Sequence, residues 1–295
     1  MTNKTREIKR IVIFLLLCFI PPVVISIIYG INTGWSSENK WFAALSNSLV
    51  VFPALANIIT RIITREGFEN NSLDIRIRGK QRYYIAGLAL PVLCTLIIVL
   101  LGYCFLISPE TRQLIKDKTD ITAVAARILY GSSMGLFLVF AGLGEELGWR
   151  GYLTPKLEKL MPLFPAVMIT GLLWGIWYIP LVISGYAFGK DYSGYPWVGI
   201  VLIILMCVFT GIFLTALTKA AGSVLPAAAS NIAGKSVCLS TASYILCIES
   251  FEETGAGGGF VFAGVVSVLS ASAGIFILLK NRKKEKLSVS TKISV

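Results

Sequence analysis

The chain contains no histidine among its 295 residues. Imidazole is the side chain that most often moves protons near neutral pH and is the commonest metal ligand, so histidine-based catalysis and histidine zinc centres are excluded. The six cysteines include no Cys-x-x-Cys pair and are expected to pack as small apolar residues. Any chemistry must therefore depend on carboxylates, amides and hydroxyls.

Charged residues are also scarce, at 15% of the chain, whereas 55% is hydrophobic. Several apolar runs reach the ~20 residues that a helix needs to cross a bilayer. The sequence predicts an all-α protein, a polytopic transmembrane helix bundle in which residues 1–295 form a single integral membrane domain. About eight spans are expected, over residues 11–31, 41–63, 83–107, 122–143, 164–185, 196–218, 223–246 and 259–279. The seventh carries Asn231 and Lys235 and must lie inside the bundle.

Acidic side chains are the scarcer charge, with 16 Asp and Glu against 27 Lys and Arg. Bases gather before the first span, after the last and between the second and third, whereas the loop after the seventh carries Glu249, Glu252 and Glu253. The positive-inside rule therefore predicts a multi-pass protein of the cell membrane with both termini cytosolic and residues 280–295 as a polar cytosolic tail. The bases flank spans and form no continuous face, which favours membrane lipids and not nucleic acid as partners.

Two adjacent glutamates, Glu145 and Glu146, stand at the predicted end of the fourth span. Ionisable side chains at membrane depth are expensive and usually functional. On a helix, Glu146 and Arg150 are four residues apart and are expected to pair. Glu145 points about 100° away and is expected to remain free, as a general base requires. The Glu146–Arg150 pair alone also fits a purely structural role.

These glutamates and two later segments resemble the motifs of the CAAX-protease and bacteriocin-processing (CPBP, Abi) family. Residues 145–153 resemble its first motif, E-E-x-x-x-R. The second motif, an aromatic residue followed four positions later by histidine, corresponds to Trp174 and Tyr178, with Tyr178 in the histidine's place. The third, His-x-x-x-Asn or His-x-x-x-Asp, corresponds to Ala227 and Asn231, with Ala227 in the histidine's place. The resemblance covers roughly residues 124–247.

The resemblance implies a bundle around a cavity that faces the cytosol and in which the motifs meet. Active members are intramembrane endopeptidases, in which the first glutamate and the second-motif histidine are thought to activate water while the third-motif residues stabilise the oxyanion. The implied catalytic residues are Glu145, Glu146, Arg150, Tyr178 and Asn231. Tyr178 and Asn231 equally fit roles in packing and in interhelical hydrogen bonding. Trp149, Trp174 and Trp177 are expected only to pack, and Pro180 and Pro226 to kink helices beside the site.

The two missing histidines leave two hypotheses about function. The first is an endopeptidase that cleaves a lipidated or leader peptide with Glu145 as base. The second is a non-catalytic relative that binds an apolar or lipidated peptide as an immunity or regulatory membrane protein. Each lost acid–base group is worth about 10²–10⁴-fold in rate, which favours the second. The family residues have also been described as metal ligands, but two glutamates and amide oxygens suit zinc poorly, so no cofactor is expected.

Overall fold

The computed structural model describes residues 3–69, 72–106, 108–109, 113, 120–137, 139–235 and 261–281, and within these ranges the chain is helical and has no strand. Within the described ranges, six helical segments are long and apolar enough to cross a membrane. They are α1 (Asn3–Thr33), α2 (Phe42–Ile63), α3 (Gln81–Leu101) with η1 (Gly102–Leu106), α8 (Leu163–Trp177) with α9 (Ile179–Ile183), α10 (Trp197–Ala221) and a last helix (Val261–Asn281). The predicted all-α polytopic bundle is confirmed.

The predicted fourth and seventh spans carry motif residues and are not among these six. Helix α5 (Ile121–Phe137) precedes α6 (Val139–Gly148), and α6 runs on through η2 (Trp149–Leu153) and α7 (Thr154–Glu158). The helix thus continues beyond the predicted end of the span at residue 143, and the charged side chains that follow pair inside the bundle. Helix α11 (Leu225–Ala233) begins the seventh span, whose residues 236–246 lie outside the described residues. The total of eight stays a prediction.

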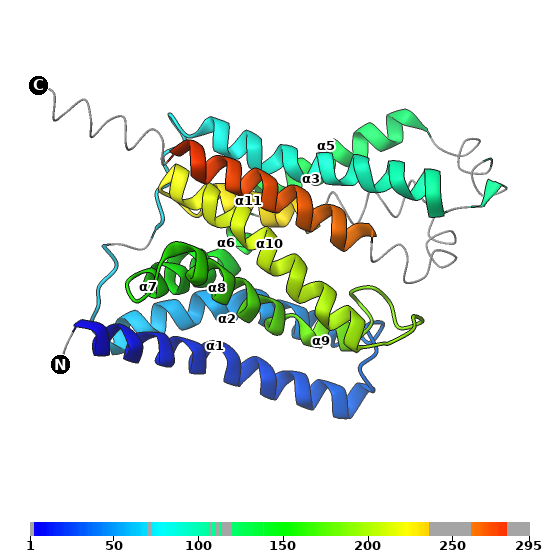
Figure 1. The fold of residues 1–295 in the computed structure, drawn as a ribbon. Coiled ribbons are helices and arrows are strands. Elements are labelled where there is room, and N and C mark those ends of the chain that lie inside the picture. Colours follow the sequence, from blue (N-terminus) through cyan, green and yellow to red (C-terminus); the bar gives the residue numbers. More distant parts are fainter. Residues whose placement is uncertain are drawn as a thin grey trace, which may run out of the picture.

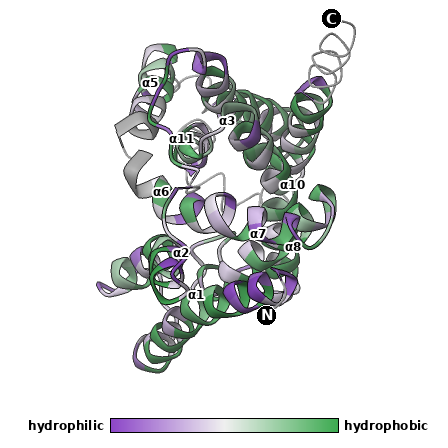
Figure 2. Ribbon diagram, turned by 90° about the vertical axis from the view of Figure 1, so that its left-hand side faces the viewer, coloured by the Kyte–Doolittle hydropathy of each residue, from purple (hydrophilic) through white to green (hydrophobic). Residues whose placement is uncertain are grey.

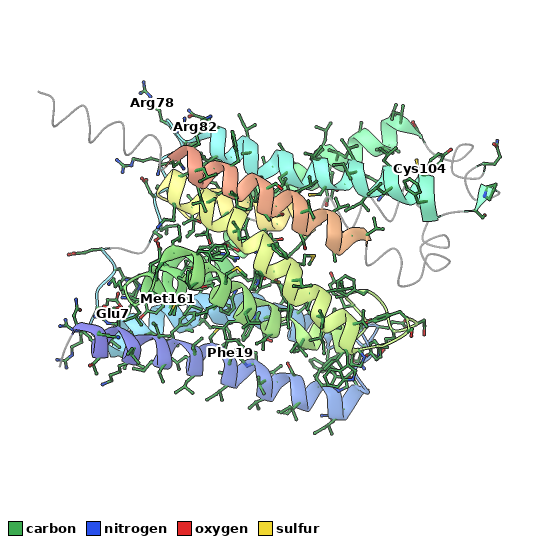
Figure 3. The ribbon with its side chains drawn as sticks, viewed as in Figure 1. Glu7, Phe19, Arg78, Arg82, Cys104 and Met161 are labelled. Carbon is green, nitrogen blue, oxygen red and sulfur yellow. The ribbon has the colours of Figure 1, made fainter. Side chains whose placement is uncertain are left out.

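The helices run alongside one another, and α1 begins at the same end of the bundle at which the last helix ends (Figure 1). We call this the N-terminal end. Glu7, Arg78 and Arg82 lie there, whereas Cys104 lies at the opposite end (Figure 3). In the view from this end, hydrophilic residues gather at the start of α1, whereas much of the length of the helices is hydrophobic (Figure 2). The predicted external loop at 249–253 lies outside the described residues.

Small residues allow α6 to lie directly against α2. A Cβ atom on Gly144 would stand 2.3 Å from the carbonyl oxygen of Val50, and one on Gly148 would stand 2.4 Å from Cβ of Pro53. Glycines four residues apart are a common means of close helix contact in membranes. The backbone contact fixes the position of the helix segment that carries Glu145 and Glu146.

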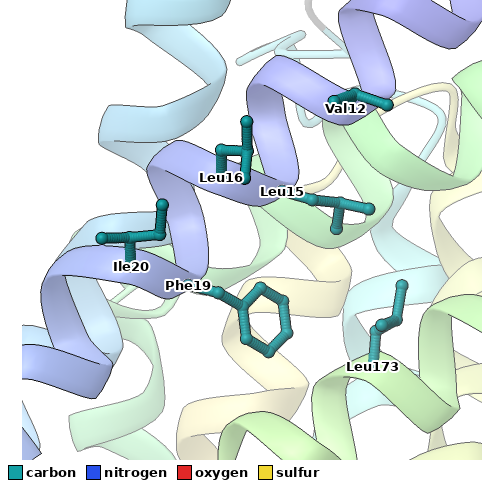
Figure 4. Close-up of a pocket in the computed structure, with 6 residues that line it drawn as sticks. All are labelled: Val12, Leu15, Leu16, Phe19, Ile20 and Leu173. Atoms are coloured by element: carbon teal, nitrogen blue, oxygen red, sulfur yellow. The ribbon is translucent and has the colours of Figure 1, made fainter.

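A groove of about 370 Å³ lies between α1 and α8 (Figure 4). Its lining is entirely apolar and consists of Val12, Leu15, Leu16, Phe19, Ile20 and Leu173. Several of these side chains are exposed on the outer face of α1, so the groove belongs to the surface that would face lipid. No motif residue lines it, and the predicted cavity around the motifs stays a prediction.

Candidate functional site

The structure brings all five predicted site residues together from three parts of the chain. Glu145 and Glu146 lie on α6, Arg150 on η2, Tyr178 between α8 and α9, and Asn231 on α11. Their exposed fractions range from 0% to 7%. Such burial of ionisable groups requires partners for each of them.

Local backbone features set two of these positions. Arg150 lies in a π turn, a wide helical turn that often occurs at functional sites. The hydroxyl of Thr154 donates to the Trp149 carbonyl at 3.0 Å and supports this turn. Tyr178 ends α8 because Pro180 lacks an N–H and cannot continue its hydrogen bonding. Pro226 lies in the first turn of α11, where proline is well tolerated, so it begins a helix and the predicted kink there is wrong.

The predicted pair between Glu146 and Arg150 forms. Arg150 Nη1 donates to Glu146 Oε1 at 3.1 Å, and the Asn231 amide donates to the same oxygen at 2.8 Å. The guanidinium lies 4.2 Å from the centre of the Trp174 ring, a cation–π contact. Within the described ranges, Glu146 Oε2 and Arg150 Nε and Nη2 are buried and have no hydrogen-bond partner.

Glu145 is not free, and that prediction is wrong. Its Oε2 accepts hydrogen bonds from the Tyr178 hydroxyl at 2.6 Å and from Trp174 Nε1 at 3.0 Å, with the Asn231 amide at 3.5 Å. Its Oε1 accepts from Lys235 Nζ at 2.7 Å. An uncompensated charge in the interior would be strongly destabilising, and α8 and α11 together supply the donors that prevent it.

Two residues of the site were missed or misjudged from the sequence. Trp174 was expected only to pack, yet it binds Glu145 and stacks on Arg150. Lys235 was noted for its polarity but was given no role. Its position offered a signal, because residues 227, 231 and 235 follow one another at intervals of four, the spacing that places residues on one face of a helix. Lys235 is the most exposed of the contacting side chains, at 39%.

Trp149 and Trp177 pack as expected. Their ring centroids lie 5.9 Å apart, and each also contacts the ring of Phe19 on α1. Trp177 Nε1 donates to the carbonyl of Leu49 on α2 at 2.9 Å. These contacts tie α1, α2 and α8 together beside the motif residues.

Charge in this site is balanced, since Glu145 pairs with Lys235 and Glu146 with Arg150. Each oxygen of Glu145 already accepts a hydrogen bond, so a water molecule that binds this carboxylate must share an oxygen with one of these donors. The residues do not fit a zinc ion, because each glutamate already binds a cation, and within the described ranges no three His, Cys, Asp or Glu side chains gather in a metal-binding group.

Comparison with known proteins agrees with the three motifs. Residues 128–234, which contain all of them, match the family described as Type II CAAX prenyl endopeptidase Rce1-like. A CAAX prenyl protease 2 of Methanococcus maripaludis is 42% identical over 45 residues, which make up 15% of this chain and 17% of that protein. The match thus spans a small part of the relative's length. The order of the motifs, their convergence in the fold and these two similarities support membership in the CAAX-protease and bacteriocin-processing family of membrane proteins.

Proposed function

We propose that this CPBP-type homologue binds a lipidated or apolar peptide at its motif site without hydrolysing it. The observation that carries the proposal is the occupied state of Glu145, which Lys235 and Tyr178 hold at 2.7 and 2.6 Å. A general base must reach the water whose proton it removes. In this site that water would have to compete with an ion pair inside a buried, charge-balanced cluster.

The absence of both motif histidines also argues against hydrolysis. Tyr178 and Ala227 stand where the family motifs have histidine, and Ala227 is fully buried in the core. If each histidine contributes about 10²–10⁴-fold to the rate, the loss of both lowers hydrolysis by several orders of magnitude. The binding of an apolar segment depends on the surrounding helices and is not removed by these changes.

A glutamate-dependent endopeptidase is the second candidate. The observation that favours it is that the Tyr178 hydroxyl and the Asn231 amide both reach the glutamate pair. Neutral donors of this kind can stabilise a tetrahedral oxyanion. In this alternative the peptide displaces Lys235, and Glu145 then receives the proton from water.

The test uses the full chain in liposomes with a farnesylated CAAX-type peptide, and it measures binding and cleavage separately. We expect the wild type to bind the peptide without cleaving it, and the folded Tyr178→His/Ala227→His variant to gain cleavage of about 10²-fold or more above background. Cleavage by the wild type that Glu145→Gln abolishes and that chelators leave unchanged would establish the second candidate instead. Absence of binding by the wild type would refute the first.

We also infer that the protein lies in the cell membrane with both termini in the cytosol. The lopsided distribution of Lys and Arg supports this orientation. It is tested by single-cysteine labelling in a variant that lacks the six native cysteines. Glu253→Cys should react with an impermeant reagent from outside the cell, and Lys4→Cys should not.

A further inference from the structure

A second buried ionic network lies at the N-terminal end of the bundle, apart from the motif site. We call it the end cluster. Figure 3 labels one of its members, Glu7, near the start of α1. It joins α1, α2, the turn after α2, and α7 with the turn that follows it. Its members are Glu7, Arg10, Arg61, Glu66, Lys156 and Lys159.

Glu7 binds three cations. Arg10 Nη1 donates to Glu7 Oε1 at 2.8 Å, and Lys159 Nζ lies 3.3 Å from the same oxygen. Lys156 Nζ lies 3.1 Å from Glu7 Oε2. The side chain of Glu7 is 4% exposed, so this carboxylate is a buried centre of the cluster.

Glu66 is the second carboxylate and shares the same cations. It binds Lys156 directly, and Arg10 Nε lies 3.4 Å from its Oε2. Arg61 Nη1 lies 3.8 Å from Oε1, and the hydroxyl of Tyr152 donates to Oε2 at 3.2 Å. Lys156 therefore bridges both carboxylates and links α7 to α1 and α2.

Positive charge exceeds negative charge in the end cluster. Even with Arg61 set aside, Arg10, Lys156 and Lys159 face only two carboxylates among the described residues. The side chains of Lys156 and Arg10 are 4% and 11% exposed. These two cations match the two carboxylates, so the surplus positive charge lies on Lys159, which is half-exposed and accessible to a further anion.

An exposed apolar face of α1 begins at Lys9, which is adjacent in the sequence to the end cluster but is not a member of it. Lys9 is exposed next to Arg10, and Val12, Leu16 and Ile20 follow it at three, seven and eleven positions, on the same helical face. These three residues line the groove of about 370 Å³ between α1 and α8 (Figure 4). A ligand that matches both features has an anionic group for the cations and a long apolar chain for the groove, as an anionic phospholipid does.

We propose that the end cluster binds the headgroup phosphate of an anionic phospholipid, with an acyl chain in the groove along α1. Lys159, whose side chain is 54% exposed, offers the approach from the membrane surface. Arginine and lysine at a helix end next to the bilayer are the usual partners of such headgroups. The site is independent of the motif chemistry and requires no peptide ligand.

The experiment titrates the purified full chain in detergent with phosphatidylglycerol, phosphatidylcholine or inorganic phosphate and follows the thermal midpoint, since a ligand of the folded state raises it. We expect phosphatidylglycerol to stabilise the protein at lower concentration than phosphatidylcholine. Lys159→Gln should weaken the apparent affinity for phosphatidylglycerol about fivefold. The matched control is Lys219→Gln, which removes an ammonium of 43% side-chain exposure that pairs with Glu158 outside the cluster.

Stabilisation by phosphatidylglycerol and not by inorganic phosphate supports a lipid site. Stabilisation by both supports recognition of the phosphate but overturns the assignment of the acyl chain to the groove. Equal effects of the two lipids overturn the proposal. So does an equal loss of affinity in Lys159→Gln and Lys219→Gln, since surface charge alone would then explain the binding.

Discussion

The two buried ionic networks of this protein are built in opposite ways. Among the described residues, each glutamate of the motif site has one cationic partner, Lys235 for Glu145 and Arg150 for Glu146. In the end cluster each carboxylate contacts three cations, and Lys156 and Arg10 contact both carboxylates. When a carboxylate has one cationic partner, no other cation replaces that partner after a substitution. When it has three, two cations remain. The fully buried Glu146–Arg150 pair of the motif site should therefore be sensitive to single substitutions and the end cluster tolerant of them.

The largest expected effect follows from breaking the fully buried pair of the motif site. Arg150→Met leaves Glu146 charged and buried with only the Asn231 amide, and it should lower the free energy of unfolding by about 3–5 kcal/mol. Unfolding in mixed detergent micelles measures this change. The double variant Glu146→Gln/Arg150→Met removes the orphaned charge and should recover part of the loss. A double variant less stable than Arg150→Met alone would contradict the argument.

A smaller effect is expected when the bridging lysine of the end cluster is removed. In Lys156→Met, Glu7 keeps Arg10 and Lys159, and Glu66 keeps Arg10 and Arg61. We expect a loss of about 1.5–3 kcal/mol, the range for a hydrogen bond to a charged group. The same unfolding assay compares it with Arg150→Met. If Lys156→Met proves equally or more destabilising, the tolerance attributed to shared pairing does not exist.

The smallest effect on stability is expected at Lys235, although it is the cation bound to Glu145. Its side chain is 39% exposed, and Glu145 Oε2 keeps the donors Tyr178 and Trp174. Lys235→Gln should lower the free energy of unfolding by about 0.5–1.5 kcal/mol, as for the loss of one hydrogen bond, because Glu145 keeps its other donors. Lys219→Gln, at 43% exposure, is the matched control. If Lys235→Gln loses as much stability as Arg150→Met, the Glu145–Lys235 pair is as important for stability as the Glu146–Arg150 pair.

The fold class could be predicted because it depends on the length of apolar runs. The Glu146–Arg150 pair could be predicted too, because residues four apart on one helix meet regardless of the rest of the fold. The three motifs located Tyr178 and Asn231 by their order along the chain. In each case the information lies within a single helix or in the spacing of a known pattern.

The partners of Glu145 could not be predicted, since they come from α8 and α11 and depend on how three helices pack. The same holds for Glu66 and Lys156, which are 90 positions apart in the sequence. Hydrophobic periodicity shows which face of a helix avoids water but not which buried polar groups meet.

The close contact of α6 with α2 has a consequence for how this site can change over evolutionary time. Gly144 and Gly148 position the glutamates because they let α6 approach α2 closely. A Cβ atom on either glycine would stand only 2.3 or 2.4 Å from an atom of α2. The location of the glutamates thus does not depend on the reactive groups around them. A framework anchored in this manner can exchange imidazoles for a phenol and a methyl group while its architecture persists. Inheritance of the scaffold and inheritance of the reaction are then separable, and the chemistry can fade or return by few substitutions.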